Sequence, residues 1–375
     1  MKSGFAFQET GRDGAARTGL LTTPSGVIET PAFMPVATYG AVRGLSPEEL
    51  RAAGAQILLA NTYHLHERPG EAIVEKLGGL RGFTGWQGPW LTDSGGYQVF
   101  SLADRLAVEE AGVTFRSPID GRERQLSPEK AVEIQQALGS DIAMVLDECP
   151  EPGASAEASL RVRAACARTQ RWAARGRSAH TRPDQALFGI VQGGAQIELR
   201  RECARAIADL GFEGHAHGGL GLGEERSLRR DVVAASHEEL PAAAPRYLMG
   251  LGRPVDLLDG LAAGVDLFDC VLPTRHARHG VLFTRRGLLK LRNARFREDP
   301  EPPEPGCGCP LCTSYSRAYL SFLIRSGEAL GARLASLHNL YFYLGLLAEA
   351  RAAIAQGQLG ALRAEIERTA TTATD

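Results

Sequence analysis

Short apolar runs alternate with amphipathic stretches along the first 270 residues of the chain. Each run ends in polar or glycine-rich residues, and the stretch that follows has its apolar positions at helical spacing. The runs cover residues 31–38, 56–65, 89–96, 141–148, 186–194, 214–224, 245–252 and 265–273. Eight strands alternating with helices predict an α/β fold, a (β/α)8 TIM-type barrel. An open doubly wound sheet is the alternative, but its glycine-rich phosphate fingerprint is absent after the first run.

Two serine-proline pairs mark helix starts between these runs. Ser46 is followed by a proline and, three residues later, by Glu49, which is the pattern of a capping box. Ser127 begins a similar pattern without the final acid. The segment 113–126 has strand character on both sides of an Asp-Gly turn, so we expect a hairpin inserted after the third strand.

The pattern changes after residue 280. A second hairpin is expected to turn near Arg286-Gly287, a proline-rich acidic loop follows, and the chain from about residue 315 is predicted to be helical. We therefore expect a catalytic barrel in residues 1–280. Residues 281–375 are expected to hold the hairpin, a C-terminal zinc-binding helical subdomain and C-terminal helices packed on the barrel.

Composition limits the class of protein. Of the 375 residues 44% are hydrophobic, and the formal net charge is −2, so affinity for nucleic acid has to come from local clusters of basic residues. No apolar stretch is long enough for a membrane span or a signal peptide, and no membrane partner is expected. Seven unevenly spaced cysteines do not suit a disulfide framework, so we expect a cytoplasmic protein with one metal site.

Three closely spaced cysteines indicate that metal site. The four expected ligands are Cys307, Cys309, Cys312 and His338. Three thiolates and one imidazole form a closed tetrahedral set for one structural Zn²⁺ per subunit, with no position left for a reactive water. His276 and His279 are alternative fourth ligands. Unmetallated thiols with an ordinary surface histidine are the plainer interpretation.

Functional groups stand at the ends of most predicted strands. Along the chain these are Asn61, Asp93, Asp147, Gln192, Gly219, Met249 and Asp269. Strand ends meet at one face of such a barrel and build its active site, so we expect these residues in one pocket. Carboxylates and amides there can pair with a planar heterocycle, and Tyr97 and Met249 can stack on its faces. Each aspartate alone is as readily explained as a helix N-cap.

Two aspartates and a basic segment suggest the chemistry. A double displacement at an anomeric carbon needs one carboxylate as nucleophile and a second group as acid and then base. We expect Asp269 to be the nucleophile, because residues 274–297 follow it with eight lysines or arginines and no acid. Arg275 and Arg278, which adjoin it, are expected to bind phosphates or read a base edge of RNA. The more distal residues 285–297 are as readily a solvated face.

Seven strings carry a resemblance to a known family. They are LTDSGGYQVFSL (91–102), LDECP (146–150), GIVQGG (189–194), GGLGLGE (218–224), YLMGLG (247–252), FDCVLPTRHARHG (268–280) and CGCPLC (307–312). In order and spacing, from about residue 3 to 370, the chain resembles the bacterial tRNA-guanine transglycosylases, also called queuine tRNA-ribosyltransferases. The resemblance implies an irregular (β/α)8 barrel with a zinc-binding subdomain, a homodimer, and a pentosyltransferase of queuosine biosynthesis.

The resemblance also implies a reaction and its residues. Asp269 attacks the ribose of the wobble guanosine in U-G-U-containing tRNAs (for Asp, Asn, His and Tyr), guanine leaves, and 7-aminomethyl-7-deazaguanine displaces Asp269, with Asp93 as general acid/base. The implied base-binding residues are Ser94, Gly95, Gly96, Tyr97, Asp147, Gln192, Gly193, Gly219, Leu220 and Met249. The implied contacts to the tRNA anticodon stem-loop are Gly250, Leu251, Gly252, Arg253, Pro254, Val255, Asp256, Thr274, Arg275, His276, Ala277 and Arg278. An anticodon loop suits such chemistry because a splayed base enters a pocket at little cost.

Three details favour the small precursor base over queuine. Cys149 follows the bacterial pattern, Leu222 stands where the eukaryotic enzyme has glycine, and no archaeal-type C-terminal RNA-binding domain is expected. His276, His279 and the Gly221-Leu222 pair depart from the usual residues of the family, which affects loop detail and pocket width.

Other functions stay open at this point. A noncatalytic RNA-binding subunit is disfavoured because Asp93 and Asp269 are both present. A nucleoside or glycoside hydrolase would pass the ribosyl group to water, and it would have no use for the basic segment. A zinc hydrolase is the least suitable alternative, because a closed Cys3His set leaves no open coordination position.

Overall fold

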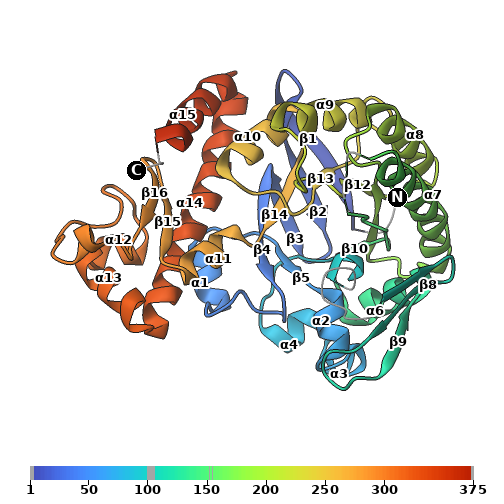
Figure 1. Ribbon diagram of the computed structural model, residues 1–375, viewed down its shortest axis with the longest axis horizontal. Coiled ribbons are helices and arrows are strands. Elements are labelled where there is room, and N and C mark those ends of the chain that lie inside the picture. The colour runs from blue at the N-terminus through green and yellow to red at the C-terminus, as the bar shows by residue number, and fades with distance from the viewer. Residues whose placement is uncertain (1–3, 99–105, 152, 154, 373–375) are drawn as a thin grey trace.

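A closed barrel of parallel strands forms the centre of the molecule (Figure 1). The computed structural model describes residues 4–98, 106–151, 153 and 155–372. In ring order the barrel strands are β4 (Ala32–Ala37), β5 (Leu58–Ala60), β6 (Trp90–Thr92), β10 (Ile142–Met144), β11 (Ala186–Val191), β12 (Gly214–His217), β13 (Arg246–Leu248) and β14 (Leu267–Cys270). Ring order equals chain order, and each predicted run contains one of these eight strands, so the predicted barrel is confirmed.

Helices surround the barrel and connect its strands. They are α1 (Pro47–Ala52), α2 (Thr62–Glu67), α3 (Glu71–Lys76), α4 (Gly79–Thr84), α6 (Pro128–Leu138), α7 (Ala156–Ala179), α8 (Ile197–Ala208), α9 (Arg226–His237), α10 (Pro254–Ala262) and α11 (Leu272–Arg278). The predicted capping box is present, because Ser46 Oγ accepts from Glu49 N and Ser46 N donates to Glu49 Oε2 at 2.9 Å. Ser127 caps α6 through the N–H of Lys130 (3.2 Å). These caps satisfy free N–H groups of the first turn and fix where each helix begins.

An N-terminal antiparallel sheet was not predicted from the pattern. Its strands are β1 (Ala6–Asp13), β2 (Ala16–Thr23) and β3 (Gly26–Thr30). The buried ion pair between Arg17 on β2 and Asp266 (2.6 Å) joins it to the chain directly before β14. Leu21 and Ile28 belong to the same apolar cluster as the barrel strands. The sheet therefore covers the amino-terminal end of the barrel.

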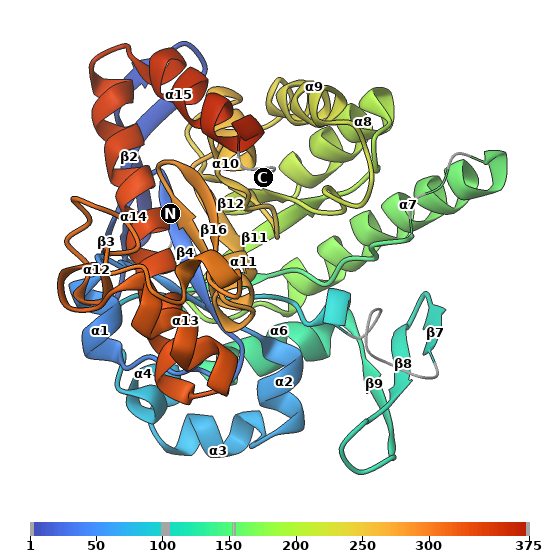
Figure 2. The same cartoon turned by 60° about the vertical axis from the view of Figure 1, so that its left-hand side comes forward.

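The predicted insertion after the third barrel strand is also present. The hairpin consists of β8 (Gly112–Arg116) and β9 (Glu123–Leu126), and β7 (Leu106–Glu109) adds a third antiparallel strand. Figure 2 shows this small sheet and the long helix α7 extending from the same side of the molecule. Arg171 and Arg175 on α7 bind Glu110 in the turn between β7 and β8, which holds the insertion against the helix.

The C-terminal part contains a hairpin and a group of helices. Its elements are β15 (Val281–Thr284), β16 (Gly287–Lys290), the 3-10 helix η1 (Ala294–Phe296), α12 (Pro310–Ser314), α13 (Arg317–Ser326), α14 (Ala329–Ala355) and α15 (Leu359–Thr372). The predicted hairpin and helical tail are confirmed. Buried residues of α14 such as Tyr343 and Leu346 share one apolar cluster with Phe33 and Phe268 of the barrel. A smaller, separate cluster surrounds Cys309, and the division of the chain at residue 280 stays a prediction.

Candidate active site

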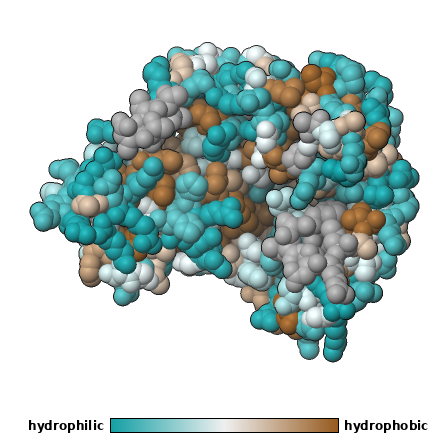
Figure 3. All heavy atoms as spheres, viewed as in Figure 1, coloured by the Kyte–Doolittle hydropathy of each residue, from teal (hydrophilic) through white to brown (hydrophobic). Residues whose placement is uncertain are grey.

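The groups predicted at strand ends gather at the carboxyl-terminal end of the barrel. Those at or just beyond the end of a strand are Asn61, Asp93, Asp147, Gln192, Gly219 and Met249. Asp269 differs from the prediction, because it lies inside β14 and pairs with Met34 of β4 as the ladder continues to Cys270. In the space-filling view the molecule is hollowed near the centre of this face, with hydrophobic residues inside and hydrophilic ones around (Figure 3).

Asp93 is held by several donors. Its Oδ1 accepts from the backbone N–H groups of Thr62 (3.0 Å) and Gly95 (3.1 Å), and its Oδ2 accepts from Asn61 Nδ2 (2.6 Å). Burial raises the pKa of Asp93 to about 7, and the negative charge of Asp269 adds to the effect of burial, although the N–H groups oppose it. A carboxyl group with this pKa can both give and take a proton near neutral pH.

Asp147 and Gln192 form a second polar group in the pocket. Gln192 Nε2 donates to Asp147 Oδ2 at 2.6 Å. Burial raises the pKa of Asp147 to about 6, while the hydrogen bond from Gln192 lowers it. The backbone of Gly218 and Gly219 lies directly on Gln192, because a Cβ atom at Gly218 would come within 2.6 Å of its Nε2 and one at Gly219 would collide with its Oε1. A side chain at either position would displace the end of Gln192, so carboxylate, amide and bare backbone meet in one place.

Asp269 has one oxygen bound and one open. Its Oδ1 accepts from Tyr247 Oη (2.7 Å) and from the N–H of Gly250 (2.7 Å). No described residue donates to Oδ2 within hydrogen-bonding distance. Burial raises the pKa of Asp269 above its usual value, and both donors lower it. The arrangement orients the carboxylate and leaves one oxygen available for attack.

The expected stacking residues lie at different depths. Tyr97 has 53% of its surface exposed, whereas Met249 is half-buried and packs against the barrel cluster. Gly95 has a φ of +80°, and a Cβ atom there would lie 3.1 Å from Tyr63 N, so a side chain would be strained and crowded. Ser94, Gly96 and Leu220 are buried beside these residues. Residues 99–102, the end of the first family string, lie outside the described residues.

The expected RNA-contacting residues form two short segments beside Asp269. In residues 250–256, Gly250 and Arg253 reach the surface, whereas Leu251, Gly252 and Asp256 are buried. Arg253 Nε is bound to Asp256 Oδ2 at 2.9 Å, so this segment is braced from within.

The second segment is helical. Thr274, Arg275, His276, Ala277 and Arg278 lie on α11. Pro273 stands in its first turn, where the missing N–H of a proline leaves no intrahelical hydrogen bond unmade. The described residues supply no ion pair to Arg275 or Arg278. Burial lowers the pKa of Arg278, and the charges of Arg43 and Arg275 lower it further, so three cations face one another.

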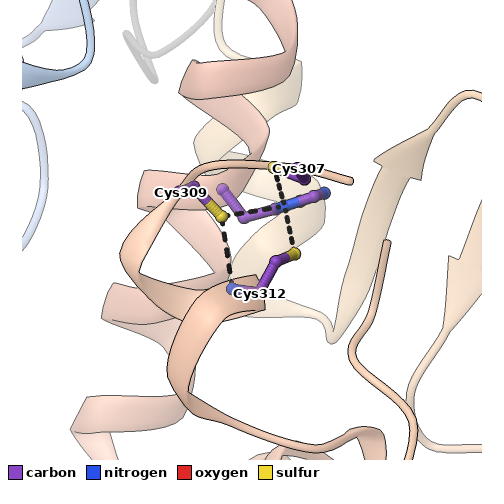
Figure 4. A group of neighbouring side chains, drawn as sticks. Cys307, Cys309 and Cys312 are labelled. Carbon is purple, nitrogen blue, oxygen red and sulfur yellow. Dashed lines mark hydrogen bonds between the residues drawn. The ribbon is translucent and has the colours of Figure 1, made fainter. Parts of the chain in front are cut away.

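The three cysteines and one histidine of the expected metal site come together. Their ligand atoms lie within 4.8 Å of one another, and Figure 4 shows the sulfur atoms of Cys307, Cys309 and Cys312 close together. His338 Nδ1 lies 3.4 Å from Cys309 Sγ and 3.3 Å from Cys312 Sγ. Its Nε2 lies 2.9 Å from the Phe283 carbonyl oxygen and can donate to it, which leaves Nδ1 free as a ligand. The donor set fits a tetrahedral metal ion.

Comparison with known proteins decides the family. A profile of the queuine tRNA-ribosyltransferase family matches residues 13–372. The chain belongs to this family. The queuine tRNA-ribosyltransferase of Thioalkalivibrio sulfidiphilus is 50% identical over 360 residues, covering 96% of each chain. That of Acidithiobacillus ferrooxidans is 52% identical over 356 residues (95% of each chain), and that of Pelotomaculum thermopropionicum 52% over 344 residues (92% of each). Membership makes the protein an enzyme, a pentosyltransferase.

Several residues of this family site were missed from the sequence. Tyr247 begins the string YLMGLG (247–252). A tyrosine in an apolar strand is usually a residue of the hydrophobic core, so nothing in the sequence indicated that its hydroxyl binds Asp269. Glu224 accepts from the N–H groups of Gly221 (2.6 Å) and Leu222 (3.1 Å) and so fixes the loop after β12. Arg200 is fully buried on α8. The sequence could have indicated this, because Arg200 stands three residues before Cys203, on the face of the helix where apolar residues are expected.

No helix among the described residues combines the length and apolar character that a membrane crossing requires.

Proposed function

We propose that this protein replaces guanine at the anticodon wobble position of U-G-U-containing tRNAs, those for Asp, Asn, His and Tyr, with 7-aminomethyl-7-deazaguanine. This is a step of queuosine biosynthesis. Membership of the family supports the substrate class. The observation that carries the chemistry is the contrast between two carboxyl groups, because Asp269 presents a free oxygen whereas Asp93 is buried with a pKa of about 7.

The first displacement forms a covalent intermediate. Oδ2 of Asp269 attacks the ribose anomeric carbon, and the glycosidic bond to guanine breaks with its electron pair on the base. Asp93 gives its proton to the leaving guanine as general acid. Tyr247 and Gly250 hold Oδ1 during the attack, so the carboxylate is oriented before the substrate arrives.

The second displacement reverses these roles. The incoming base loses a proton to Asp93, attacks the anomeric carbon and releases Asp269 as a carboxylate. Protons therefore balance, because Asp93 ends protonated as it began. General acid–base assistance of this kind typically contributes about 10²–10⁴-fold.

The pocket residues recognise the base, and α11 meets the RNA. Asp147, Gln192 and Gly219 offer acceptor and donor groups to one edge of a guanine-type base, with Ser94, Gly95, Gly96, Gly193 and the Leu220 carbonyl around it. Tyr97 and Met249 stack on its faces. Arg275 and Arg278 lack acidic partners in the described chain, which leaves them free for phosphates or a base edge.

One Zn²⁺ per subunit is the proposed metal, because a Cys3His set suits zinc. Such a closed site stabilises the fold and leaves no coordination position for a substrate. None of the seven cysteines forms a disulfide bond, which fits a reducing cytoplasm. We also propose a homodimer, as the family resemblance implies.

The test is base exchange with labelled guanine. Unmodified tRNA is incubated with the wild-type protein and with Asp269→Asn, and label in tRNA is measured. We expect incorporation by the wild type and none by the variant. No incorporation by the wild type, or substantial incorporation by the variant, would overturn the proposal.

The same assay separates the alternatives. Guanine released from tRNA without incorporation would indicate a hydrolase that passes the ribosyl group to water. Binding of tRNA with neither release nor exchange would indicate a noncatalytic subunit. A covalent protein–RNA species that is trapped on a denaturing gel with wild type, and is absent with Asp269→Asn, would support the double displacement.

A further inference from the structure

Arg200 is a buried arginine whose side chain donates its hydrogen bonds to backbone carbonyl oxygens. It lies in the first turn of α8 and is 0% exposed. In the part of the chain that the structure describes, its guanidinium donates to backbone carbonyls and to no carboxylate. Burying a charge without an ionic partner is costly, so the carbonyls around it must be well placed.

The three carbonyls belong to two neighbouring loops of the pocket. Nη1 donates to Val191 O (2.9 Å) at the end of β11, and Nε donates to Gly194 O (2.8 Å) in the turn that follows. Nη2 donates to Gly218 O (2.7 Å) in the loop after β12. These loops carry Gln192 and Gly219, the residues proposed to bind one edge of the base. The Arg200 side chain therefore links the two loops.

The bond to Gly218 also fixes a direction. The carbonyl and the N–H of one trans peptide point opposite ways. With the Gly218 carbonyl turned toward Arg200, the N–H of Gly219 points away from it. Gly219 has a φ of +64°, and a Cβ atom there would come too close to Gln192 Oε1, so a side chain at this position would be strained and crowded. The Gly218–Gly219 peptide is therefore fixed by the hydrogen bond from Arg200 to its carbonyl oxygen, on the side opposite to the Gly219 N–H.

We propose that Arg200 is a positioning residue of the base pocket, which holds the Gly218–Gly219 peptide so that the Gly219 N–H faces the carbonyl oxygen of a guanine-type base. This inference rests on the proposed function. It predicts a defect specific to bases that carry that oxygen. A merely structural role would weaken the binding of every base to the same degree.

Guanine and 2-aminopurine separate these roles. 2-Aminopurine lacks the carbonyl oxygen and, with it, the N1–H donor, and the comparison is of how each variant changes the ratio of the two affinities relative to wild type. Binding of 2-aminopurine is followed by its fluorescence, and guanine by competition, for wild type, Arg200→Lys and Arg200→Met. A lysine reaches fewer carbonyls than the planar guanidinium and a methionine reaches none. We expect guanine affinity to fall by about tenfold or more, the worth of one hydrogen bond in a buried site, and 2-aminopurine affinity to change less than about twofold.

Arg201→Met is the matched control, because Arg201 is the next residue on α8 and pairs with Glu238 at its outer side. It should leave both affinities unchanged. The ratio of the two affinities, taken on one sample, does not depend on how much of a variant is folded. Equal losses for both bases, or an unchanged ratio in both Arg200 variants, would overturn this inference alone. A wild-type protein with no preference for guanine would overturn the proposed function as well.

Discussion

The hydroxyl of Tyr247 donates to Oδ1 of Asp269 at 2.7 Å. Tyr247 is buried on β13, and Asp269 lies on the neighbouring strand β14. The N–H of Gly250 donates to the same oxygen, so two rigid donors oppose the effect of burial on the pKa of this carboxyl group. The hydroxyl of a buried tyrosine therefore supports the ionised state that the proposed nucleophile needs.

Tyr247→Phe should slow the reaction without weakening RNA binding. A hydrogen bond to a charged group contributes about 1.5–3 kcal/mol, so kcat should fall by about tenfold to a hundredfold. Without this donor the pKa of Asp269 rises, and the acidic limb of the pH–rate profile should move to higher pH. Steady-state kinetics from pH 5 to 8 measure both effects, with Tyr315→Phe as a control far along the chain. An acidic limb that stays in place would contradict the assigned role.

Asp93 should lower the stability of the protein at neutral pH. Its pKa is about 7 in the folded state and 3.8 in the reference state, so folding favours the protonated form. The contribution of Asp93 to the free energy of unfolding is therefore largest below pH 3.8, where the carboxyl group is protonated in both states. It decreases as the pH rises and is lost once the pH passes 7. At about 1.4 kcal/mol per pH unit, Asp93→Asn should be more stable than wild type at pH 8 by up to about 4 kcal/mol, and less so at pH 5.

Urea unfolding at both pH values measures this difference, and base exchange should meanwhile fall by about 10²–10⁴-fold. Asp231→Asn is the control, because Asp231 lies exposed on α9. A stability gain in Asp93→Asn that does not change with pH would show that Asp93 is ionised throughout and would contradict the expected titration.

A buried histidine pair should make the protein sensitive to mild acid. His217 Nε2 lies 2.8 Å from His237 Nε2, and His237 Nδ1 lies 2.7 Å from Ala263 O. The second contact places the His237 proton on Nδ1, so its Nε2 accepts from His217 and both rings are neutral. Burial lowers the pKa of both well below the usual 6.5, and for His237 the charge of Arg246 adds to this.

The unfolded chain binds these protons as pH falls below about 6.5, and the folded chain does not. The free energy of unfolding is therefore highest above that pH. As the pH falls below it, the free energy of unfolding decreases by up to about 1.4 kcal/mol per pH unit for each histidine. Replacing both residues with leucine should flatten the profile between pH 7.5 and 5.5, measured by urea unfolding. An equally steep profile in the double variant would mean that other groups cause the loss.

Removal of the metal should affect the C-terminal part more than the barrel pocket. The apolar cluster around Cys309 is small, so the metal bond contributes much of its stability. On the same helix as His338, Asn339 Nδ2 donates to Pro273 O (2.8 Å) and Tyr343 Oη donates to Gly252 O (2.5 Å). Loss of the metal should loosen the start of α11 and the loop before α10.

We expect Cys309→Ser to contain no zinc by elemental analysis, to be cleaved by protease within residues 281–328, and to bind tRNA weakly. Guanine binding should change little, because the pocket residues lie on the barrel. Equal loss of guanine and tRNA binding would contradict this division of effects.

Arg275 and Arg278 should contribute to RNA binding through charge. Replacing both with alanine should weaken binding of an anticodon stem-loop and reduce the dependence of log Kd on log salt by about 1.4, or about 0.7 for each phosphate contact to a single strand. Arg205→Ala is the control, because Arg205 is exposed and paired with Glu239. A weaker affinity with an unchanged salt slope would mean that the arginines read a base edge and not phosphates.

Local patterns in the sequence determined much of this protein. Apolar runs placed all eight barrel strands, because a buried parallel strand needs a continuous apolar stretch whatever packs on it. The serine caps before α1 and α6 and the crowded cysteines were equally readable, since each depends on residues close together in the chain. Chain order around the barrel then brought Asp93, Asp147 and Asp269 to one end.

Tertiary structure decided the contacts that tune those residues. The N-terminal sheet was not predicted, because its strands are rich in polar residues and are held in place by the distant partner Asp266. The bonds from Tyr247 to Asp269 and from Arg200 to Gly218 join neighbouring strands and loops, and their existence depends on the stagger of those strands and on the depth at which α8 packs. A sequence pattern shows that a side chain is buried, whereas the partner it meets there is fixed only when the barrel closes.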